Sequence, residues 1–511
     1  MKKKEISLFL LVIFIGLVLR FYNLNNLPME MYGDIVEGYK FTQEILTGKW
    51  PFYFVLGNGP LFFYFVAIIA KIFGLYFLTM KIASAIVGVG IIIITYCLGK
   101  ELFGKETGLI TAFLIAVSKW PLIFSRLGNM PILVPLFTSI IYLLFFKISK
   151  NPKNNKDWVM LGTFLGLGLY VYPAFFINPI AVFFLFLSLG FHFWKKNWAK
   201  MFASLIFFLI FASKFYFLIS GNLQGWVDSN SYFGGKIFVS QGKLAEDWPQ
   251  KLKSNIVKTA LMFNFIEADH SVRNNGSKQS ALDFVSGVFL WLGLISGIWR
   301  KENRKNTVLV LLGTFLLMFP AILVLNVSSD VPSMCRTIGA IPLIFVLVGH
   351  GGSFFIKILK RILIKPSGVW RVVFLLGILI IFLNAKMYFK DYAFSLPNHN
   401  EGFPYLIAQY VDRLPDNTQI FMYKGGWAEW YQPDWRAVSY EFKTPKKYTH
   451  IEKGEFNCQF FDPLISPKYF ILDPGSTQDL AEIKNCLLGG KEEMHFSPKY
   501  HFPLFVSYHL P

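Results

Sequence analysis

The chain has few charged residues and few cysteines for its length. Only 16% of its 511 residues are charged and only four are cysteines, whereas 54% are hydrophobic and 56 are phenylalanines. A water-soluble chain of this length needs more polar surface, a disordered chain has far fewer apolar residues, and a disulfide-rich scaffold has more cysteines. These shortages exclude all three classes and indicate an integral membrane protein.

Acidic residues are scarce relative to basic ones, with 31 Asp and Glu against 50 Lys and Arg and a net charge of +19. In a membrane protein, Lys and Arg gather in short cytoplasmic loops and beside anionic lipid headgroups. The excess comes without a basic amphipathic domain or a nucleic-acid-binding motif. Membrane lipid is therefore an expected partner and nucleic acid is not.

The sequence also lacks the signatures of several enzyme classes. It contains no P-loop, Rossmann glycine fingerprint, HExxH motif or GxSxG motif in a fitting context. Its four cysteines and eight histidines show no metal-ligand spacing. The residues thus support no metal site and no cofactor, and leave a metal requirement open. Cys458 and Cys486 lie in the same C-terminal region and can pair if that region is outside the cell.

Eleven apolar runs are long enough to approach a hydrocarbon layer of ~30 Å. The first follows Met-Lys-Lys-Lys without a small-residue cleavage site, so we expect a retained transmembrane helix there. A further run, 61–73, is interrupted near its end by Lys71, and its length suits a re-entrant or interfacial helix. The eleven runs are 5–22, 80–98, 107–124, 130–147, 157–173, 174–193, 200–220, 283–299, 307–327, 336–356 and 369–388.

The basic residues between these runs predict the orientation in the membrane. If 61–73 does not cross, five basic loops fall on the same side as the N-terminus, as the positive-inside rule demands. If it crosses, all five move outside. We therefore predict eleven spans in the cell (cytoplasmic or inner) membrane, with the N-terminus inside and the C-terminus outside. The five loops contain Lys100/Lys105, Lys147/Lys150/Lys153/Lys156, Lys195/Lys196/Lys200, Arg300/Lys301/Arg304/Lys305 and Lys357/Lys360/Arg361/Lys365/Arg371.

The predicted fold class is an all-α polytopic membrane protein with a small extracytoplasmic α/β domain at its C-terminus. The membrane domain takes residues 1–388 and includes two long outer loops, 23–79 and 221–282. The C-terminal domain takes residues 389–511, where strand-like runs at 419–423, 469–472 and 504–508 alternate with Pro, Gly and Asp turns.

Six basic residues depart from the positive-inside pattern, each near the outer end of an apolar segment. A charge at membrane depth usually faces a partner or a cavity, although snorkelling to outer headgroups can explain part of the set. Their convergence on one face favours an anionic ligand such as a lipid-linked phosphate, which Arg binds through two hydrogen bonds and Lys as a point charge. The six are Arg20, Lys71, Lys81, Arg126, Lys214 and Arg336.

The outer loops carry the other candidate residues. In Tyr-Gly-Asp-Ile-Val-Glu-Gly-Tyr, Asp34 and Glu37 share one face if the segment is helical. A carboxylate that faces a basic cavity can serve as a general base for an acceptor hydroxyl, and a pair of solvated loop acids is the alternative. In the second loop, residues 267–276 bring together polar groups that suit sugar or phosphate recognition, or an ordinary exposed turn: Asp269, His270, Arg273 and Asn275.

Several different short motifs follow one another along residues 1–385. They include Gly33-Asp34, Gly59-Pro60, Phe124-Ser-Arg126-Leu-Gly128, Tyr170-Val-Tyr172-Pro, Asp269 to Gly276, and Arg336-Thr-Ile-Gly. With this set the sequence resembles the C-type (GT-C) membrane glycosyltransferases. The nearest resemblance is to the phospholipid-carrier-dependent group, which includes protein O-mannosyltransferases and lipid A aminoarabinose transferases.

The resemblance implies that a sugar, a hexose or pentose, passes from a polyprenyl-phosphate donor to a protein, lipid or glycan acceptor on the extracytoplasmic side. It implies Asp34 as the catalytic base or as a carboxylate that orients the acceptor, with Glu37 as an imperfect substitute for the second acid of an Asp-Glu pair. A second departure is Asn58-Gly59 before Pro60, where some relatives have Lys. The resemblance implies Arg126 and Arg336 as donor-phosphate ligands, with Lys81 at a position often occupied by Arg, and we add Lys71 from the set of six basic residues. The residues that we expect to bind substrate are Tyr39, Tyr172, Asp269, Arg273 and Asn275.

Three further functions are compatible with the sequence. A transporter or flippase of a lipid-linked or anionic substrate typically shows repeated halves or charges near the midplane. In this chain the polar residues gather at one face, which favours a transferase. The second possibility is a non-catalytic protein that binds a lipid-linked sugar, and the third is a hydrolase of the same donor.

Overall fold

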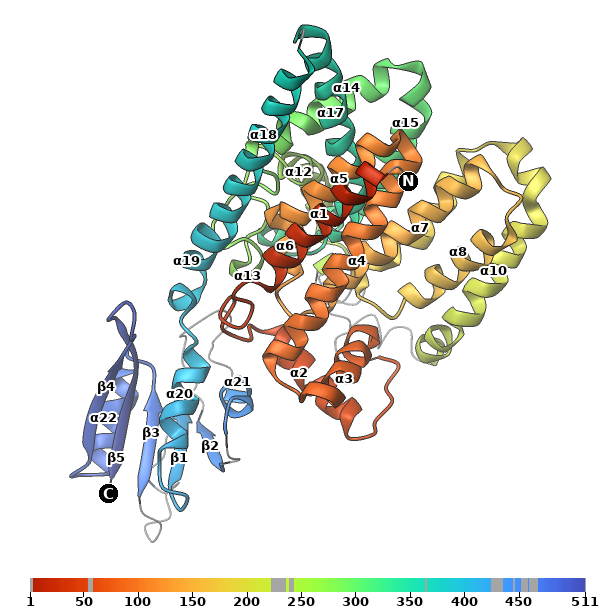
Figure 1. Ribbon diagram of the computed structural model, residues 1–511. Coiled ribbons are helices and arrows are strands. Elements are labelled where there is room, and N and C mark those ends of the chain that lie inside the picture. Colours follow the sequence, from red (N-terminus) through yellow and green to blue (C-terminus); the bar gives the residue numbers. More distant parts are fainter. Residues whose placement is uncertain are drawn as a thin grey trace. The chain divides into compact units, whose positions relative to one another are not determined.

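The computed structural model describes residues 3–53, 58–221, 236–238, 243–363, 365–423, 435–443, 446–451, 458 and 467–510. Contacts divide the chain into two units. The helical unit contains Met1–Leu24 and Phe41–Tyr392, and the C-terminal unit contains Asn25–Lys40 and Ala393–Pro511. Figure 1 shows helices throughout the first unit and strands only in the second. The predicted outer loop 221–282 falls partly outside the described residues, at 222–235 and 239–242.

The helical unit is built from helices of very different length. Their bounds are α1 (Lys3–Phe21), α3 (Leu61–Phe73), α4 (Phe77–Phe103), α5 (Lys105–Val117), α6 (Lys119–Phe124), α7 (Leu133–Lys150), α8 (Asn155–Gly168), α9 (Ile177–Leu187), α10 (Phe191–Ser220), α12 (Trp248–Leu261), α13 (Val272–Asn275), α14 (Phe284–Trp299), α15 (Lys301–Leu317), α16 (Phe319–Ile322), α17 (Ile341–Ile362) and α18 (Pro366–Lys386). Short 3₁₀ helices lie between them, η2 (Met130–Ile132), η3 (Pro173–Phe176), η5 (Ser328–Asp330) and η6 (Ile338–Ala340), and the π-helix η7 (Met387–Tyr392) follows α18. The helix α2 (Asp34–Leu46) begins in the C-terminal unit and ends in the helical unit.

Six helical segments among the described residues are long and apolar enough to cross a membrane. They are Phe77–Phe103, Met130–Lys150, Phe191–Ser220, Lys301–Ile322, Ile338–Ile362 and Pro366–Ser395. Three shorter apolar helices accompany them: Leu61–Phe73, Pro173–Leu187 and Phe284–Trp299. The chain is therefore a multi-pass membrane protein. Six of the eleven predicted runs correspond to these helices, which are both long enough and apolar enough to cross a membrane.

The predicted run 107–124 is one of those that the structure divides. The helix α5 ends at Val117, Ser118 is extended with φ −69° and ψ 141°, and α6 begins at Lys119. A continuous helix would need an N–H at residue 121 to bond the carbonyl of Val117, and Pro121 has none. Proline is well tolerated in the first turn of a new helix, so the chain restarts the helix at this point.

Glycines allow two of the membrane helices to touch through their backbones. A Cβ at Gly293 of α14 would lie 2.0 Å from the carbonyl oxygen of Leu347, and one at Gly351 of α17 would lie 1.8 Å from that of Phe289. Small residues at such crossings are the usual means of packing helices in lipid. The short helix α14 is thereby fixed against the long, buried helix α17.

The C-terminal unit contains a mixed five-stranded sheet in the order β2-β1-β3-β5-β4. The strands β1 and β3 are parallel, as are β1 and β2, whereas β5 runs antiparallel to both β3 and β4. The strands are β1 (Gln419–Tyr423), β2 (Tyr448–Ile451), β3 (Lys468–Leu472), β4 (Lys491–Phe496) and β5 (Pro503–Leu510). The helices are α19 (Ala393–Ser395), η8 (Pro397–Asn400), α20 (Phe403–Asp412), α21 (Trp435–Tyr440) and α22 (Thr477–Cys486).

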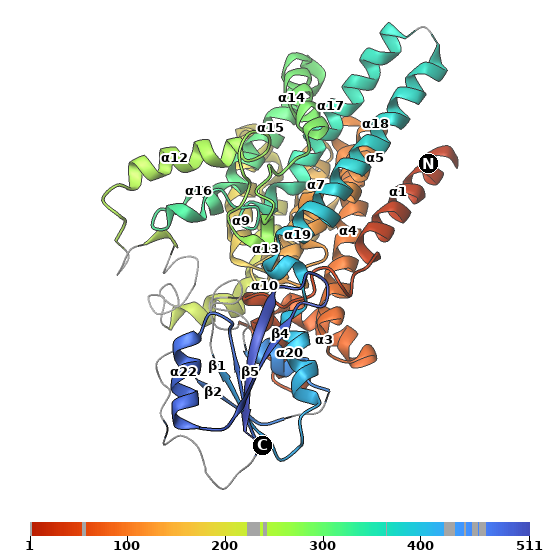
Figure 2. The same cartoon turned by 90° about the vertical axis from the view of Figure 1, so that its left-hand side faces the viewer.

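Alternate residues of the central strands build a core on each face of this sheet. Ile420 and Met422 pack with Ile407 of α20, and Phe421 and Tyr423 pack on the other side with residues of α22. Figure 2 shows these two helices on opposite sides of the sheet. This alternation follows from the two-residue period of a strand. The small mixed α/β domain and its three predicted strands are confirmed. The two edge strands, β2 and β4, were not predicted from the sequence.

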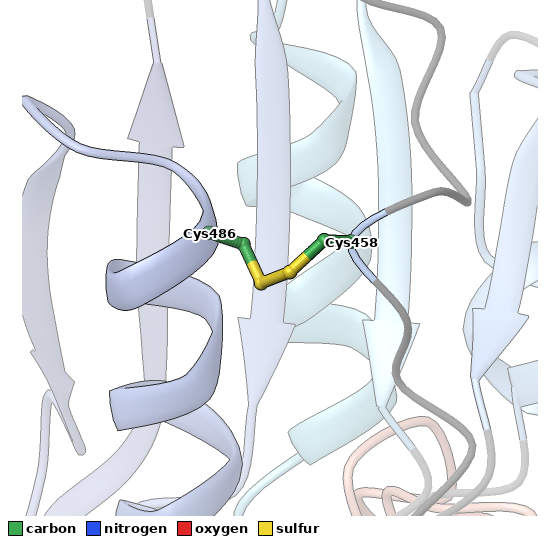
Figure 3. Close-up of a disulfide and its surroundings, with 2 residues drawn as sticks. All are labelled: Cys458 and Cys486. Atoms are coloured by element: carbon green, nitrogen blue, oxygen red, sulfur yellow. A yellow bond between two sulfur atoms is a disulfide. The ribbon is translucent and has the colours of Figure 1, made fainter.

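A disulfide joins Cys458 to Cys486 at the end of α22 (Figure 3). The pairing that the sequence allowed is therefore present in the structure. It closes a loop whose ends are 28 residues apart.

We expect the double variant Cys458→Ser/Cys486→Ser to lose about 2–4 kcal/mol of stability in the C-terminal unit, because the bond restricts the unfolded chain. Thermal unfolding monitored by hydrogen exchange of the β1 and β3 peptides checks this. Cys97→Ser, which removes a free cysteine of the helical unit, is the control. Equal protection of the strands in wild type and double variant would contradict the prediction.

Candidate functional site

The two candidate carboxylates of the first outer loop lie in the first turn of α2. Asp34 is exposed, whereas Glu37 is half-buried and forms an ion pair with Arg436 of α21. Acidic residues are favourable at a helix N-terminus because the helix dipole is positive there. The structure therefore confirms that the segment is helical. It also gives the two acids different surroundings, since Asp34 is exposed and Glu37 is partly buried beside Arg436.

Tyr39 is buried two residues further along α2 and stacks on Tyr440 of α21, with ring centroids 4.3 Å apart and an interplanar angle of 21°. Both partners of α2, Arg436 and Tyr440, come from the C-terminal unit. Residues 25–40 belong to the same unit, so these are contacts within one folded body. Arg436 was not identified from the sequence, and 399 residues separate it from Glu37.

Two of the six basic residues predicted to lie at the outer face cap helix ends. Arg20 is fully buried and donates to the carbonyl oxygens of Ile115 (3.1 Å) and Ala116 (2.9 Å) in the last turn of α5. Arg126 is also fully buried, and its Nη1 donates to the carbonyl oxygens of Leu19 and Arg20, both at 2.8 Å, in the last turn of α1. The last carbonyls of a helix lack intrahelical partners and carry negative dipole charge. Each guanidinium thus supplies hydrogen bonds to two carbonyl oxygens at the end of a helix.

Arg126 also contacts the segment after α18. Its Nε donates to the hydroxyl of Tyr388 at 2.9 Å, and its guanidinium carbon lies 5.2 Å from the centre of that ring. Such a cation–aromatic contact is favourable when both groups are desolvated. Arg126 therefore joins α1 and η7 inside the helical unit.

The three lysines of the set have different surroundings. Lys81 of α4 is fully buried, and its Nζ lies 4.4 Å from the centre of the Phe77 ring. Lys81 also lies against Gly128, two residues after Arg126. Lys71, in the last turn of α3, and Lys214, over the Phe52 ring, are exposed.

Asp269 is the centre of a hydrogen-bond network that joins two loops of the helical unit. Its Oδ1 accepts from the backbone N–H of Ser271 at 2.9 Å, and its Oδ2 accepts from the Ser333 hydroxyl at 3.1 Å and the Met334 N–H at 2.7 Å. The residue is 4% exposed. Burial raises its pKa, while these hydrogen bonds and the charge of Arg336 oppose the rise. The network holds the segment 269–275, which contains α13, against the loop before α17.

Arg336 lies in that second loop and is bound to Asp330. Its Nη2 donates to the carboxylate of Asp330 and its Nη1 to the carbonyl oxygen of the same residue, both at 2.9 Å. Lys236 forms an ion pair with the same carboxylate. Although burial alone would raise it, these two cations hold the pKa of Asp330 below its usual range.

Cys335 marks the point where the two loops and a third segment approach each other. Its Sγ lies 3.5 Å from the hydroxyl oxygen of Tyr172, which precedes η3. Burial raises the pKa of the Cys335 thiol to about 11, while the charges of Arg273 and Arg336 act in the opposite direction. The structure thus brings five of the predicted site residues into one group, hereafter the loop cluster: Tyr172, Asp269, Arg273, Asn275 and Arg336.

One cation of this region, Lys119, was missed from the sequence. It is fully buried at the start of α6, and its Nζ donates to the side-chain oxygen of Asn275 at 2.9 Å. Its backbone N–H donates to the side chain of Asn384 of α18. A lysine inside the apolar run 107–124 was the available signal, because a charge in such a run usually has an internal partner.

The pKa of Asp330 predicts how stability depends on pH. The pKa of Asp330 is lower in the folded chain than in the unfolded chain, where it is about 3.9. Its ion pairs therefore stabilise the fold at pH values above the unfolded-state pKa. This contribution is lost as the pH falls through the folded-state pKa. Asp330→Asn should therefore be less stable than wild type near neutral pH, and the difference should shrink under acid conditions.

Thermal unfolding of both proteins in detergent from about pH 7 down to about pH 3 checks this linkage. The control is Glu302→Gln, which removes a mostly exposed carboxylate 3.9 Å from Arg300. A stability difference between wild type and Asp330→Asn that stays constant with pH would count against the assignment.

Comparisons with known proteins agree with this architecture. Residues 57–217 match the family described as dolichyl-phosphate-mannose-protein mannosyltransferase. An uncharacterized protein of Aquifex aeolicus is 27% identical over 187 residues, which cover 35% of this chain and 38% of the relative. The chain thus spans about two fifths of the length of that curated relative.

Among solved structures, ArnT from Cupriavidus metallidurans bound to undecaprenyl phosphate matches with a TM-score of 0.60 at 11% identity, over 98% of this chain and 97% of that chain. The fold is that of ArnT. Because residues 57–217 match the dolichyl-phosphate-mannose-protein mannosyltransferase family and the fold matches that of ArnT, the predicted resemblance to the GT-C enzymes is confirmed. The oligosaccharyltransferase of Archaeoglobus fulgidus matches more weakly, with a TM-score of 0.49 at 15% identity over 87% of this chain and 60% of that one.

Proposed function

We propose that the chain transfers a sugar from a polyprenyl-phosphate donor to an acceptor at the extracytoplasmic face of the cell membrane. The observation that carries the proposal is the loop cluster, which assembles two arginines, a tyrosine and buried polar groups in an ArnT-like helical unit. The GT-C family match over residues 57–217 supports the reaction class. The ArnT structure contains undecaprenyl phosphate, which favours a long polyprenyl carrier.

The proposed topology has eleven spans, with the N-terminus inside and the C-terminus outside. The boundary between the membrane domain and the extracytoplasmic domain would then fall between residues 388 and 389. The disulfide between Cys458 and Cys486 supports an oxidising compartment for the C-terminal unit. The helix Leu61–Phe73, at 13 residues, supports the proposal that this segment does not span the membrane.

In the proposed reaction, Asp34 takes the proton of the acceptor hydroxyl or amine as that atom attacks the anomeric carbon. A bond forms from the acceptor atom to the anomeric carbon, and the bond from that carbon to the phosphate oxygen breaks. Polyprenyl phosphate leaves with the electron pair. Glu37, through its ion pair with Arg436, would hold the turn that carries Asp34.

The cations would act on the leaving phosphate, where negative charge develops. We assign Arg336 the main role, since its guanidinium lies in the loop cluster, and we add Arg126, Lys81 and Lys71 as further donor-binding residues. Tyr39, Tyr172, Asp269, Arg273 and Asn275 would bind or position substrate. The acceptor would be a protein, a lipid or a glycan.

The proposal is tested by incubating the purified protein with a panel of polyprenyl-phosphate sugars and membrane extract, and following label transfer by mass spectrometry. We expect one donor to glycosylate a defined acceptor. Donor consumption without acceptor labelling would indicate a hydrolase. Movement of intact donor across a vesicle membrane without transfer would indicate a flippase.

A further inference from the structure

The C-terminal unit contains a cavity that the proposed reaction does not use. It has a volume of about 440 Å³, within the range of small-molecule sites. Its lining joins the segment after α18 to the start of β5: Phe394, Ser395, Leu396, Asn398, His399 and Phe502. All of these residues belong to one unit.

Aromatic rings form one part of this cavity. Phe394 and His399 stack with centroids 4.0 Å apart and an interplanar angle of 12°, and Phe502 meets His399 nearly edge-on at 5.9 Å. Phe394 is nevertheless 56% exposed. The rings are thus fixed by one another and still present apolar surface to solvent.

Polar groups form the other part. The side-chain Nδ2 of Asn398 is buried and has no hydrogen-bond partner among the described residues. The Nδ1 of His399 lies 2.8 Å from the carbonyl oxygen of Phe394. Because that oxygen can only accept, Nδ1 carries the proton, and in a neutral ring Nε2 is left as an acceptor. An unsatisfied buried amide is costly unless a ligand or water completes it.

The backbone turn at this site is already fixed without a ligand. Asn398, His399 and Asn400 have φ values of 52°, 53° and 64°, a region that non-glycine residues seldom occupy. The side chain of Asn400 fixes this turn by donating to the carbonyl oxygen of Asn26 at 2.8 Å and accepting from the N–H of Met29 at 3.0 Å. Strained turns of this kind persist only when their surroundings hold them, and they concentrate at binding sites.

We propose that this cavity binds a neutral sugar unit of a glycan. A sugar ring has an apolar C–H face that fits an aromatic ring, and a rim of hydroxyls that fits an amide and an imidazole nitrogen. Lys and Arg are absent from the described lining, so the site does not fit the phosphate of a lipid-linked donor. The choice of occupant rests on the proposed sugar-transfer function, and the site would let the C-terminal unit hold a glycan acceptor.

The experiment measures binding of fluorescently labelled mannotriose, maltotriose and N-acetylchitotriose to the full chain in nanodiscs. We expect saturable binding of at least one probe, weakened about tenfold by Phe394→Ala, which corresponds to about 1.4 kcal/mol. Asn398→Gly accepts the same backbone conformation and removes only the amide, so it should weaken binding as well. Phe496→Ala is the matched control, because Phe496 is 55% exposed in the same unit and does not line the cavity.

Hydrogen exchange locates the contact. The bound probe should protect the backbone around 397–402 and 500–503 in the wild type. Binding that Phe394→Ala and Asn398→Gly leave unchanged, or no saturable binding up to about 10 mM, would overturn the inference. So would protection of these segments by nanodisc lipid alone with no further change on adding probe, which would make the site a membrane contact, or displacement of the probes by unrelated peptides.

The two proposals fail separately. Label transfer from a polyprenyl-phosphate donor without probe binding in the wild type would refute the glycan site and leave the transferase intact. Probe binding that depends on Phe394, in a protein that transfers nothing from any donor, would refute the transferase and leave the glycan site.

Discussion

Asp34→Asn should reduce sugar transfer by about 10²–10⁴-fold, the range that general-base catalysis usually contributes, while the protein still inserts and folds. The amide keeps the size of the carboxylate but cannot accept a proton. Asp34 is exposed at the first residue of α2, so the change removes no core packing. Initial rates of label transfer at saturating donor and acceptor measure the effect.

Two variants of the same helix make this result specific. Glu37→Gln breaks the ion pair with Arg436 and should lower the rate less than Asp34→Asn, because it disturbs position rather than proton transfer. Glu44→Gln removes a carboxylate that lies 3.7 Å from the exposed Lys49 and should leave the rate unchanged. If Asp34→Asn turns over like the wild type, Asp34 is not the base.

Arg336→Ala should reduce transfer by about 10²–10³-fold, the usual cost of losing one donor to developing negative charge. We also expect the donor KM to rise, since Arg336 would contact the phosphate before and during the reaction. Arg336→Lys should recover part of the rate, because a lysine keeps the charge but cannot donate through two nitrogens at once. Steady-state kinetics with varied donor concentration separate these effects.

Arg336 also pairs with Asp330, so the loss of activity must be distinguished from damage to the fold. Asp330 also pairs with Lys236, so removing Asp330 and Arg336 alone would leave Lys236 unpaired. In Arg336→Ala/Asp330→Asn/Lys236→Gln all three charges are absent, and no charge of this group is left without a partner. Thermal stability should then recover, at least in part, while donor binding does not. Arg304→Ala, which removes an exposed arginine of the 301–305 region, is the control for net charge. Recovery of transfer in the triple variant would assign Arg336 a purely structural role.

Much of the fold could be predicted from the sequence because the apolar runs are long and the central strands alternate. The predicted runs 80–98, 130–147 and 336–356 largely coincide with helices of the structure. The break at Ser118 was missed because apolar content hides it, and only Pro121 signals it. The edge strand β4 was missed because most of its residues are exposed and give no alternation.

The site was predictable in part for similar reasons. Asp269 and Arg336 were found because polar residues among apolar runs are conspicuous. Their hydrogen-bond network could not be predicted, because it joins residues that are more than sixty positions apart in the sequence. The sequence placed Arg20 and Arg126 near an outer face but could not show that their donors reach helix carbonyls, since that depends on which helix ends meet. The pairing of Glu37 with Arg436 depends on a contact across 399 residues, and no local pattern encodes it.

The inclusion of residues 25–40 in the C-terminal unit has a consequence for biosynthesis. The hydrogen bond from Met29 to Asn400 joins residues 371 positions apart, and the partners of Glu37 and Tyr39 lie later still. The ribosome therefore synthesises the chain as far as Asn400 before the segment with Asp34 can acquire the first of these partners. A chain that stops before Arg436 should insert its first helices but lack the contacts that hold Glu37 and Tyr39, so activity should arise only after Arg436 and Tyr440 have been made.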